Sequence, residues 1–124
     1  MDYTFSKREK LKSKKLIEKL FTEGKSVSKY PLKLIYVKAD LNDEVKVQAG
    51  VSVSKRNFKR ATDRNRIKRL IREAYRLNKN FIFNNIQTQY AFMFLYIGKQ
   101  IPKNYDEINK NMIKLMQKFI DNEN

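Results

Sequence analysis

Hydrophobic residues near the start of the chain recur with the period of an α-helix. In SKKLIEKLFTEG, residues 13–24, Leu16, Ile17, Leu20 and Phe21 fall on one helical face. A serine precedes this apolar group and a glycine follows it, and these are typical N-cap and C-terminal signals. The pattern therefore predicts a short amphipathic helix.

The period changes to two in the next part of the chain. YPLKLIYVKAD, residues 30–40, has a proline near its start, where a strand tolerates the missing N–H. VKVQAGVSVSK, residues 45–55, alternates between apolar and polar positions, and the turn-like LNDE separates the two segments. We expect these two strands to pair as a hairpin.

Three further elements are predicted in the second half of the chain. A helix spans about residues 59–77, and the asparagine-rich residues 78–89 form a polar connection. YAFMFLYI, residues 90–97, is apolar on both faces, which is typical of a central strand. A last helix covers residues 105–124. Its apolar stripe consists of Ile108, Met112, Leu115, Met116 and Phe119.

The order of these elements predicts an α/β (α+β) fold with one domain, residues 1–124. We expect a compact two-layer sandwich in which helices pack on a small mixed sheet, in the order αββαβα. The long segment between the second and third strands allows a βαβ crossover, which would add a parallel pair to the hairpin. Repeats and linkers are absent from the sequence.

The charge of the chain points to its class of partner. Lys and Arg number 28 against 13 Asp and Glu, which gives a formal net charge of +15 over 124 residues. Hydrophobic residues make up 41% of the chain, so it can fold despite this self-repulsion. Such a positive field favours a polyanion, either a nucleic acid or an anionic membrane surface.

Composition also excludes several kinds of chemistry. The chain has no His and no Cys, so imidazole acid–base catalysis, thiol nucleophiles and disulfides are excluded. The N-terminal MDYTFSKREKLKSKK has no apolar signal region, and no apolar run approaches the roughly 18–20 residues of a membrane span. We expect a soluble cytoplasmic protein with no metal site and no catalytic side chain of its own.

The predicted helix at residues 59–77 carries charge of almost one sign. From Lys55 to Arg76 there are ten cations and two acids. On a helical wheel, Ile67, Leu70 and Ile71 share the buried side with Ala74, and the cations cover the opposite side. A helix face that only contacts solvent usually carries both positive and negative side chains. A face with cations alone is typical of a surface that phosphate groups neutralise on binding. The candidate nucleic-acid-binding residues are Lys55, Arg56, Lys59, Arg60, Arg64, Asn65, Arg66, Lys68, Arg69, Arg72 and Arg76.

The string SVSKRNFKRATDRNRIKRLIREAYR, residues 52–76, resembles the protein subunit of bacterial ribonuclease P. Its core is the RNR block, which starts at Arg64, and the preceding GVSVSK matches the strand that leads into the family's helix. The segment KLIEKLFTEGKSV, residues 15–27, is similar to the family's first helix and the turn after it. The resemblance covers nearly the whole chain.

This resemblance implies a left-handed βαβ crossover and a role beside a catalytic RNA. In that family, the protein and the catalytic RNA together remove the 5′ leader of precursor tRNA, and the RNA subunit holds most of the Mg²⁺ that the reaction uses. The resemblance further implies that the protein binds the RNA subunit and, in a cleft between the first helix and the sheet, the leader. The cleft candidates are Ile17, Phe21, Ile35 and Tyr36, although each of them could instead belong to the core.

Three other interpretations remain open at this stage. A ribosomal protein or an RNA chaperone would have similar composition, although the RNR block argues against both. A DNA-binding helix reads bases with a few polar side chains, whereas here cations cover a whole face. A membrane-surface helix would combine its basic face with large exposed apolar groups, and the apolar side here suits burial. We expect no DNA and no membrane partner.

Overall fold

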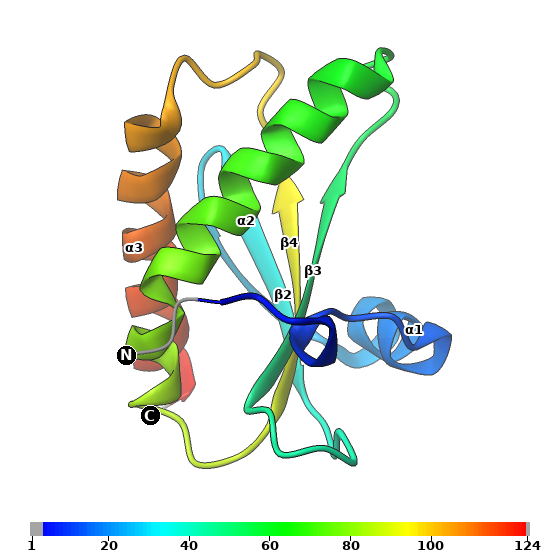
Figure 1. Cartoon of the computed structure of the whole chain (residues 1–124), viewed down its shortest axis with the longest axis vertical. Helices are drawn as coiled ribbons and strands as arrows, with labels where there is room; N and C mark the ends of the chain where they lie inside the picture. The colour runs from blue at the N-terminus through cyan, green and yellow to red at the C-terminus, as the bar shows by residue number, and fades with distance from the viewer. Residues whose placement is uncertain (1–3, 124) are drawn as a thin grey trace.

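The computed structural model describes residues 4–123, which form helices and strands in the predicted class (Figure 1). A short 3₁₀ turn, η1, precedes the first α-helix. The helices are α1 (Lys14–Glu23), α2 (Ala61–Phe83) and α3 (Tyr105–Glu123). The strands are β1 (Lys25–Lys29), β2 (Leu32–Lys38), β3 (Val47–Val53) and β4 (Tyr90–Tyr96).

The four strands form one mixed sheet in the order β1-β2-β4-β3. β4 lies in the centre, antiparallel to β2 and parallel to β3, as its apolar residues predicted. The predicted hairpin between β2 and β3 is wrong, because β4 lies between them. β2 pairs instead with β1, which sequence analysis missed, since KSVSK has too few apolar residues to mark a strand.

The crossover from β3 through α2 to β4 is left-handed. In Figure 1 both strands point upward, α2 lies in front of the sheet, and β4 is to the left of β3. A right-handed crossover would place β4 to the right, so the chain is one of the rare exceptions to that rule. The prediction from the family resemblance is confirmed.

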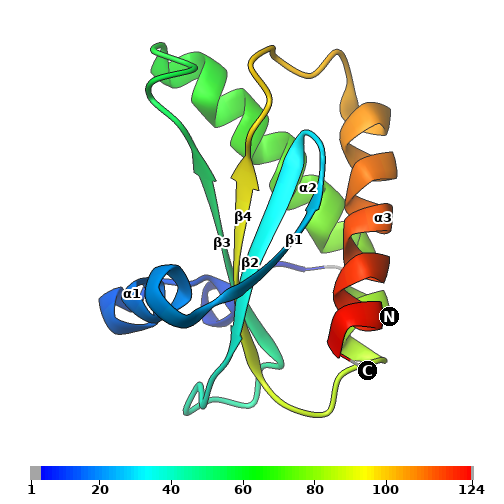
Figure 2. The ribbon, with the colours of Figure 1, turned by 180° about the vertical axis from the view of Figure 1, so that it is seen from behind.

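The helices cover the sheet unequally. α2 and α3 pack on one face, and α1 lies on the other, as Figure 2 shows from behind. The main core lies under α2 and α3, where the whole predicted stripe of α3 is buried. A smaller cluster forms under α1, where Leu20 packs near Ala91 and Met93. Part of the second face is therefore left without a helix above it.

The middle helix is longer than predicted. α2 continues to Phe83, so the expected polar connection begins six residues too early. Its polar residues have partners that the sequence did not show: the Asn78 side chain donates to Ala74 O at 2.8 Å and to Asn109 Oδ1 of α3 at 2.7 Å. Ile82 is fully buried on the same helix. These tertiary contacts stabilise a helical end that asparagine-rich sequence disfavours by itself.

The ends of α1 agree with the predicted signals. Ser13 Oγ accepts a hydrogen bond from the backbone N–H of Leu16 at 3.3 Å, and Gly24 ends the helix. Gly24 is needed for space, because a Cβ there would lie 2.7 Å from Ile35 Cγ2 and still closer to Leu20 O. Its small size therefore lets α1 turn directly into the sheet. No helix within residues 4–123 is long and apolar enough to cross a membrane.

Candidate RNA-binding interface

The outer face of α2 presents a continuous set of polar and cationic groups. Ile67, Ile71 and Ala74 are fully buried against the sheet, and Leu70 is half-buried. The side chains on the opposite side are exposed or half-buried. This basic face consists of Asn65, Arg66, Lys68, Arg69, Arg72 and Arg76. The structure therefore places these predicted residues together on one solvent-facing surface.

The loop before α2 extends the basic face toward the end of the sheet. Lys55, Arg56, Lys59 and Arg60 are all exposed there. Arg64 differs from them, because its Nη1 donates to Phe58 O at 2.8 Å and to Lys59 O at 2.9 Å. These bonds hold the loop against the start of the helix. Arg64 thus positions the neighbouring cations as well as adding its own charge.

Acidic partners are scarce on this surface. Glu73 pairs with Arg76, with 2.5 Å between Oε1 and Nη2, and this hydrogen bond raises the pKa of Arg76. No other cation of the basic face forms an ion pair with the carboxylates of residues 4–123. Like charges a turn apart repel by a few tenths of a kcal/mol per pair. The remaining cations are therefore available to a polyanion, which would relieve this repulsion.

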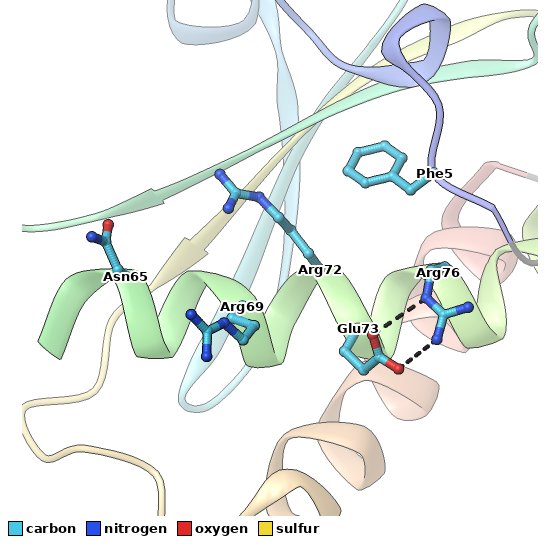
Figure 3. Close-up of a pocket in the computed structure, with 6 residues that line it drawn as sticks. All are labelled: Phe5, Asn65, Arg69, Arg72, Glu73 and Arg76. Atoms are coloured by element: carbon cyan, nitrogen blue, oxygen red, sulfur yellow. Dashed lines mark hydrogen bonds and ion pairs between the residues drawn. The ribbon is translucent and has the colours of Figure 1, made fainter. Parts of the chain in front are cut away.

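A hollow of about 350 Å³ opens along the basic face (Figure 3). Its walls are Phe5, Asn65, Arg69, Arg72, Glu73 and Arg76. Phe5 comes from the N-terminal segment and packs edge-on against Tyr75, with ring centroids 5.7 Å apart. Lys10 Nζ lies 5.9 Å from the Phe5 ring centroid. An aromatic ring among cations is a typical stacking element for unpaired bases.

Phe5 and the segment that carries it are not among the residues that the sequence pattern predicted. The available signal was an aromatic residue just before a lysine-rich stretch, and nothing in that stretch has helical or strand periodicity. Two long-range contacts dock the segment. Leu11 N donates to Ala49 O at 3.0 Å at the edge of β3, and the buried Lys79 Nζ lies 2.6 Å from Glu9 Oε1.

A second hollow, of about 500 Å³, lies between α1, the N-terminal segment and the open part of the sheet. Ile17 of α1 and Met93 of β4 line it, together with Gly50 of β3. Phe5 and Arg72 line both hollows, so the basic face and this cleft meet at the edge of β3. Nothing in the sequence indicated that junction.

The four cleft candidates lie in different environments. Ile17 is half-buried in the cleft, and Ile35 is half-buried beneath α1. Phe21 is 56% exposed on α1, which excludes the core alternative for that residue. Tyr36 lies in the core on the opposite face of the sheet, where the centroids of its ring and the Phe119 ring are 4.8 Å apart. It therefore cannot line the cleft, because neighbouring strand residues point to opposite faces.

The surface has few groups suited to acid–base or metal chemistry. Within residues 4–123 no cluster of three or more carboxylate, His or Cys side chains could hold a metal ion. What the surface offers is guanidinium, ammonium, amide and aromatic groups.

A basic helix on a mixed sheet, beside a cleft with aromatic and cationic walls, defines the class of RNA-binding α/β proteins. Within this class, the family model for ribonuclease P matches residues 5–120 of the chain. The chain belongs to the family of bacterial ribonuclease P protein components. The resemblance that the RNR block indicated is therefore confirmed. The chain is a tRNA-processing component and not a ribosomal protein.

Relatives and solved structures agree with this assignment. The ribonuclease P protein component of Porphyromonas gingivalis is 36% identical over 103 residues, which covers 81% of this chain and 75% of that protein. The ribonuclease P protein component of Clostridium botulinum is 35% identical, and the match covers 90% of this chain and 95% of that protein. The ribonuclease P protein of Staphylococcus aureus superposes with a TM-score of 0.71 at 19% identity, covering 90% and 94%. That of Thermotoga maritima gives 0.69 at 21% identity, covering 89% and 96%. At such identities the two structures support the fold alone.

Proposed function

We propose that the basic face of α2 binds the RNA subunit of ribonuclease P and that the cleft beside α1 receives the 5′ leader of precursor tRNA. The unneutralised charge of the basic face carries this proposal, because most of its cations have no acidic partner among residues 4–123. Arginine is well suited to this role, since its planar guanidinium binds phosphate in a bidentate manner.

The leader assignment is supported by the geometry of the cleft. A single strand binds where cations follow its backbone and flat side chains contact its bases. The cleft offers Lys10, Lys12 and Arg72 for the backbone and Phe5 for a base. Because Arg72 and Phe5 also line the hollow on α2, a leader in the cleft would lie directly beside the bound RNA subunit. The protein would then hold enzyme RNA and substrate together.

In this proposal the RNA subunit carries the cleavage step with Mg²⁺ that the RNA itself holds. The protein neutralises repulsion between two polyanions, which strengthens substrate binding and raises the effective affinity for metal ions. Arginine cannot act as a base at neutral pH, because it remains protonated. The cytoplasmic location and the single-domain organisation expected from the sequence remain predictions.

We expect the affinity of the protein for the RNA subunit to fall steeply with salt concentration. A face that releases counterions from several phosphates should give a log–log slope of several units. The double variant Arg69→Ala with Arg72→Ala should lower that slope by about two units, since each phosphate contact contributes roughly one. Filter binding between about 50 and 500 mM salt measures the slope.

The matched control is a pair of exposed lysines on α3, which do not belong to the basic face. Lys110→Ala with Lys114→Ala removes the same charge from exposed positions. If affinity depends on total charge alone, both double variants will change the slope equally, and the assignment to α2 will be wrong. Thermal unfolding should show that both variants keep the fold, because none of the four side chains is buried.

Phe21→Ala should weaken the binding of precursor tRNA more than that of mature tRNA. Only the precursor carries a leader, and losing one stacked base costs about 1–3 kcal/mol. Stability should hardly change, because the Phe21 ring is 56% exposed. Neither Phe21 nor Phe81 lines a hollow, but Phe21 lies one turn from Ile17, which lines the cleft. Phe81→Ala is therefore the control, since Phe81 is 41% exposed on α2 and has no such neighbour on α1. Equal weakening for the two tRNAs would exclude a leader contact at Phe21.

A further inference from the structure

An exposed tyrosine marks a third surface, at the end of the sheet. Tyr30 lies in the turn between β1 and β2 and is 66% exposed. It borders a hollow of about 410 Å³ formed with the connection from β4 to α3. Neither the RNR block nor the cleft includes this hollow. A large aromatic ring that is this exposed has few apolar contacts within the protein, and its faces are accessible for stacking on a partner.

Backbone contacts hold the walls of this hollow in place. Ile97 N donates to Pro31 O at 2.8 Å, which ties the connection to the turn beside Tyr30. The Tyr96 hydroxyl donates to Gln100 O at 2.6 Å. Gly98 fits closely between them, because a Cβ there would lie 2.9 Å from both Pro31 Cβ and the Tyr96 hydroxyl. These contacts therefore fix the shape of the hollow.

The charge around Tyr30 is mainly positive. Lys99 and Lys103 line the hollow and are exposed, and Lys29 directly precedes Tyr30. The carboxylate on its wall, Glu107, accepts a hydrogen bond from Lys103 N at 3.1 Å. An aromatic ring beside ammonium groups fits an unpaired nucleotide, with the base on the ring and the phosphate near the lysines.

The turn between β1 and β2 and the connection from β4 to α3 both contribute to this hollow. These two segments lie at the end of the sheet where α2 begins, whereas α1 lies toward the other end (Figures 1 and 2). The Tyr96 ring that forms a wall of the hollow packs on Phe58, with centroids 5.8 Å apart. Phe58 O in turn accepts the bond from Arg64 that holds the loop before α2. A short chain of packed residues therefore fixes the spacing between Tyr30 and the basic face.

We propose that Tyr30 stacks on an unpaired nucleotide of the RNA subunit, so that the RNA interface continues from α2 around the end of the sheet. Lys99 and Lys103 contact the phosphates that flank this nucleotide. The RNA subunit, rather than the leader, is the occupant because the hollow adjoins the start of α2 and not the cleft. This inference rests on the proposed function of the basic face.

The test compares Tyr30→Ala with Tyr30→Phe in equilibrium binding to the RNA subunit transcribed from the same genome. Loss of one stacked base should weaken binding by roughly 5- to 150-fold in Tyr30→Ala, whereas Tyr30→Phe keeps a ring and should bind within about 3-fold of the unmodified protein. Melting temperatures should be unchanged in both, since the side chain is largely exposed. Binding of Tyr30→Ala equal to that of the unmodified protein overturns the inference.

A fluorescent reporter gives an independent measurement. The chain has no Trp, so Tyr30→Trp introduces a single indole. Stacking on a base should quench its emission when the RNA subunit is added. Ile113→Trp, on α3 at a position that is 48% exposed, should not be quenched. Equal quenching in the two variants, or no quenching in Tyr30→Trp, contradicts a specific stack.

Failure of this inference is distinguishable from failure of the proposed function. If the unmodified protein does not bind the RNA subunit, the proposed function itself is wrong. If it binds with a steep salt dependence and Tyr30→Ala is unaffected, only the stacking site is wrong. Weaker binding of precursor tRNA alone, with RNA-subunit binding unchanged, would overturn the choice of the RNA subunit as occupant.

Discussion

Replacing Lys79 with methionine is expected to destabilise the protein by about 3–5 kcal/mol, because the substitution leaves the Glu9 carboxylate buried without its partner charge. The Lys79 side chain is 1% exposed and that of Glu9 is 8% exposed, with 2.6 Å between Nζ and Oε1. Lys79 Nζ also donates to Thr4 O. Urea unfolding followed by circular dichroism measures the loss.

Two controls separate the buried pair from the general effect of losing a lysine. Lys110→Met removes an exposed lysine and should change stability by less than about 0.5 kcal/mol. Adding Glu9→Leu to Lys79→Met removes the orphaned charge and should recover part of the loss, since apolar replacement of a whole buried pair is often nearly neutral. A loss below about 1 kcal/mol in Lys79→Met would show that Glu9 remains solvated.

The same substitution should also affect RNA binding. Lys79 and Glu9 dock the N-terminal segment that carries Phe5, and Phe5 lines both hollows. Under conditions where α2 stays folded, detachment of this segment should weaken leader binding more than binding to the RNA subunit. The arginines of the basic face belong to α2 itself and would remain in place.

Leader cleavage by the RNA subunit at low Mg²⁺ is expected to depend on the protein. If two or three leader nucleotides are held at about 1–1.5 kcal/mol each, precursor tRNA should bind roughly 30- to 2,000-fold more tightly with the protein than without it. Cleavage of precursor tRNA with and without the protein, at limiting substrate and low Mg²⁺, measures this gain. A protein that leaves cleavage unchanged would have no substrate-binding role.

No side chain of the RNR block should take part in the chemical step. Arg64→Ala, Asn65→Ala and Arg66→Ala should each weaken assembly or the response to Mg²⁺, and more protein or more Mg²⁺ should restore the rate. Single-turnover cleavage at saturating protein and high Mg²⁺ isolates the step. A remaining loss of roughly 10²–10⁴-fold in any one variant is the size expected of a missing general acid or base and would contradict this prediction.

Sequence patterns predicted the helices more accurately than the strand pairing. The ends of α1 follow from its cap and its glycine, which are local signals. The error at α2 arose because Asn78 and Lys79 are polar, yet one bonds across to α3 and the other is buried with Glu9. The hairpin error arose because two consecutive strands usually pair, whereas the crossover inserts β4 between β2 and β3.

The sequence by itself determined the basic face, because helical periodicity places Arg69 and Arg72 opposite Ile67 and Ile71 whatever the rest of the chain does. It also determined that histidine and cysteine chemistry is excluded. Only the tertiary structure decided that Phe5 joins this face, that Tyr36 belongs to the core, and that two hollows meet at the edge of β3. Those features depend on pairing between residues far apart in the chain, such as Glu9 with Lys79, and no local pattern of polarity encodes such pairing.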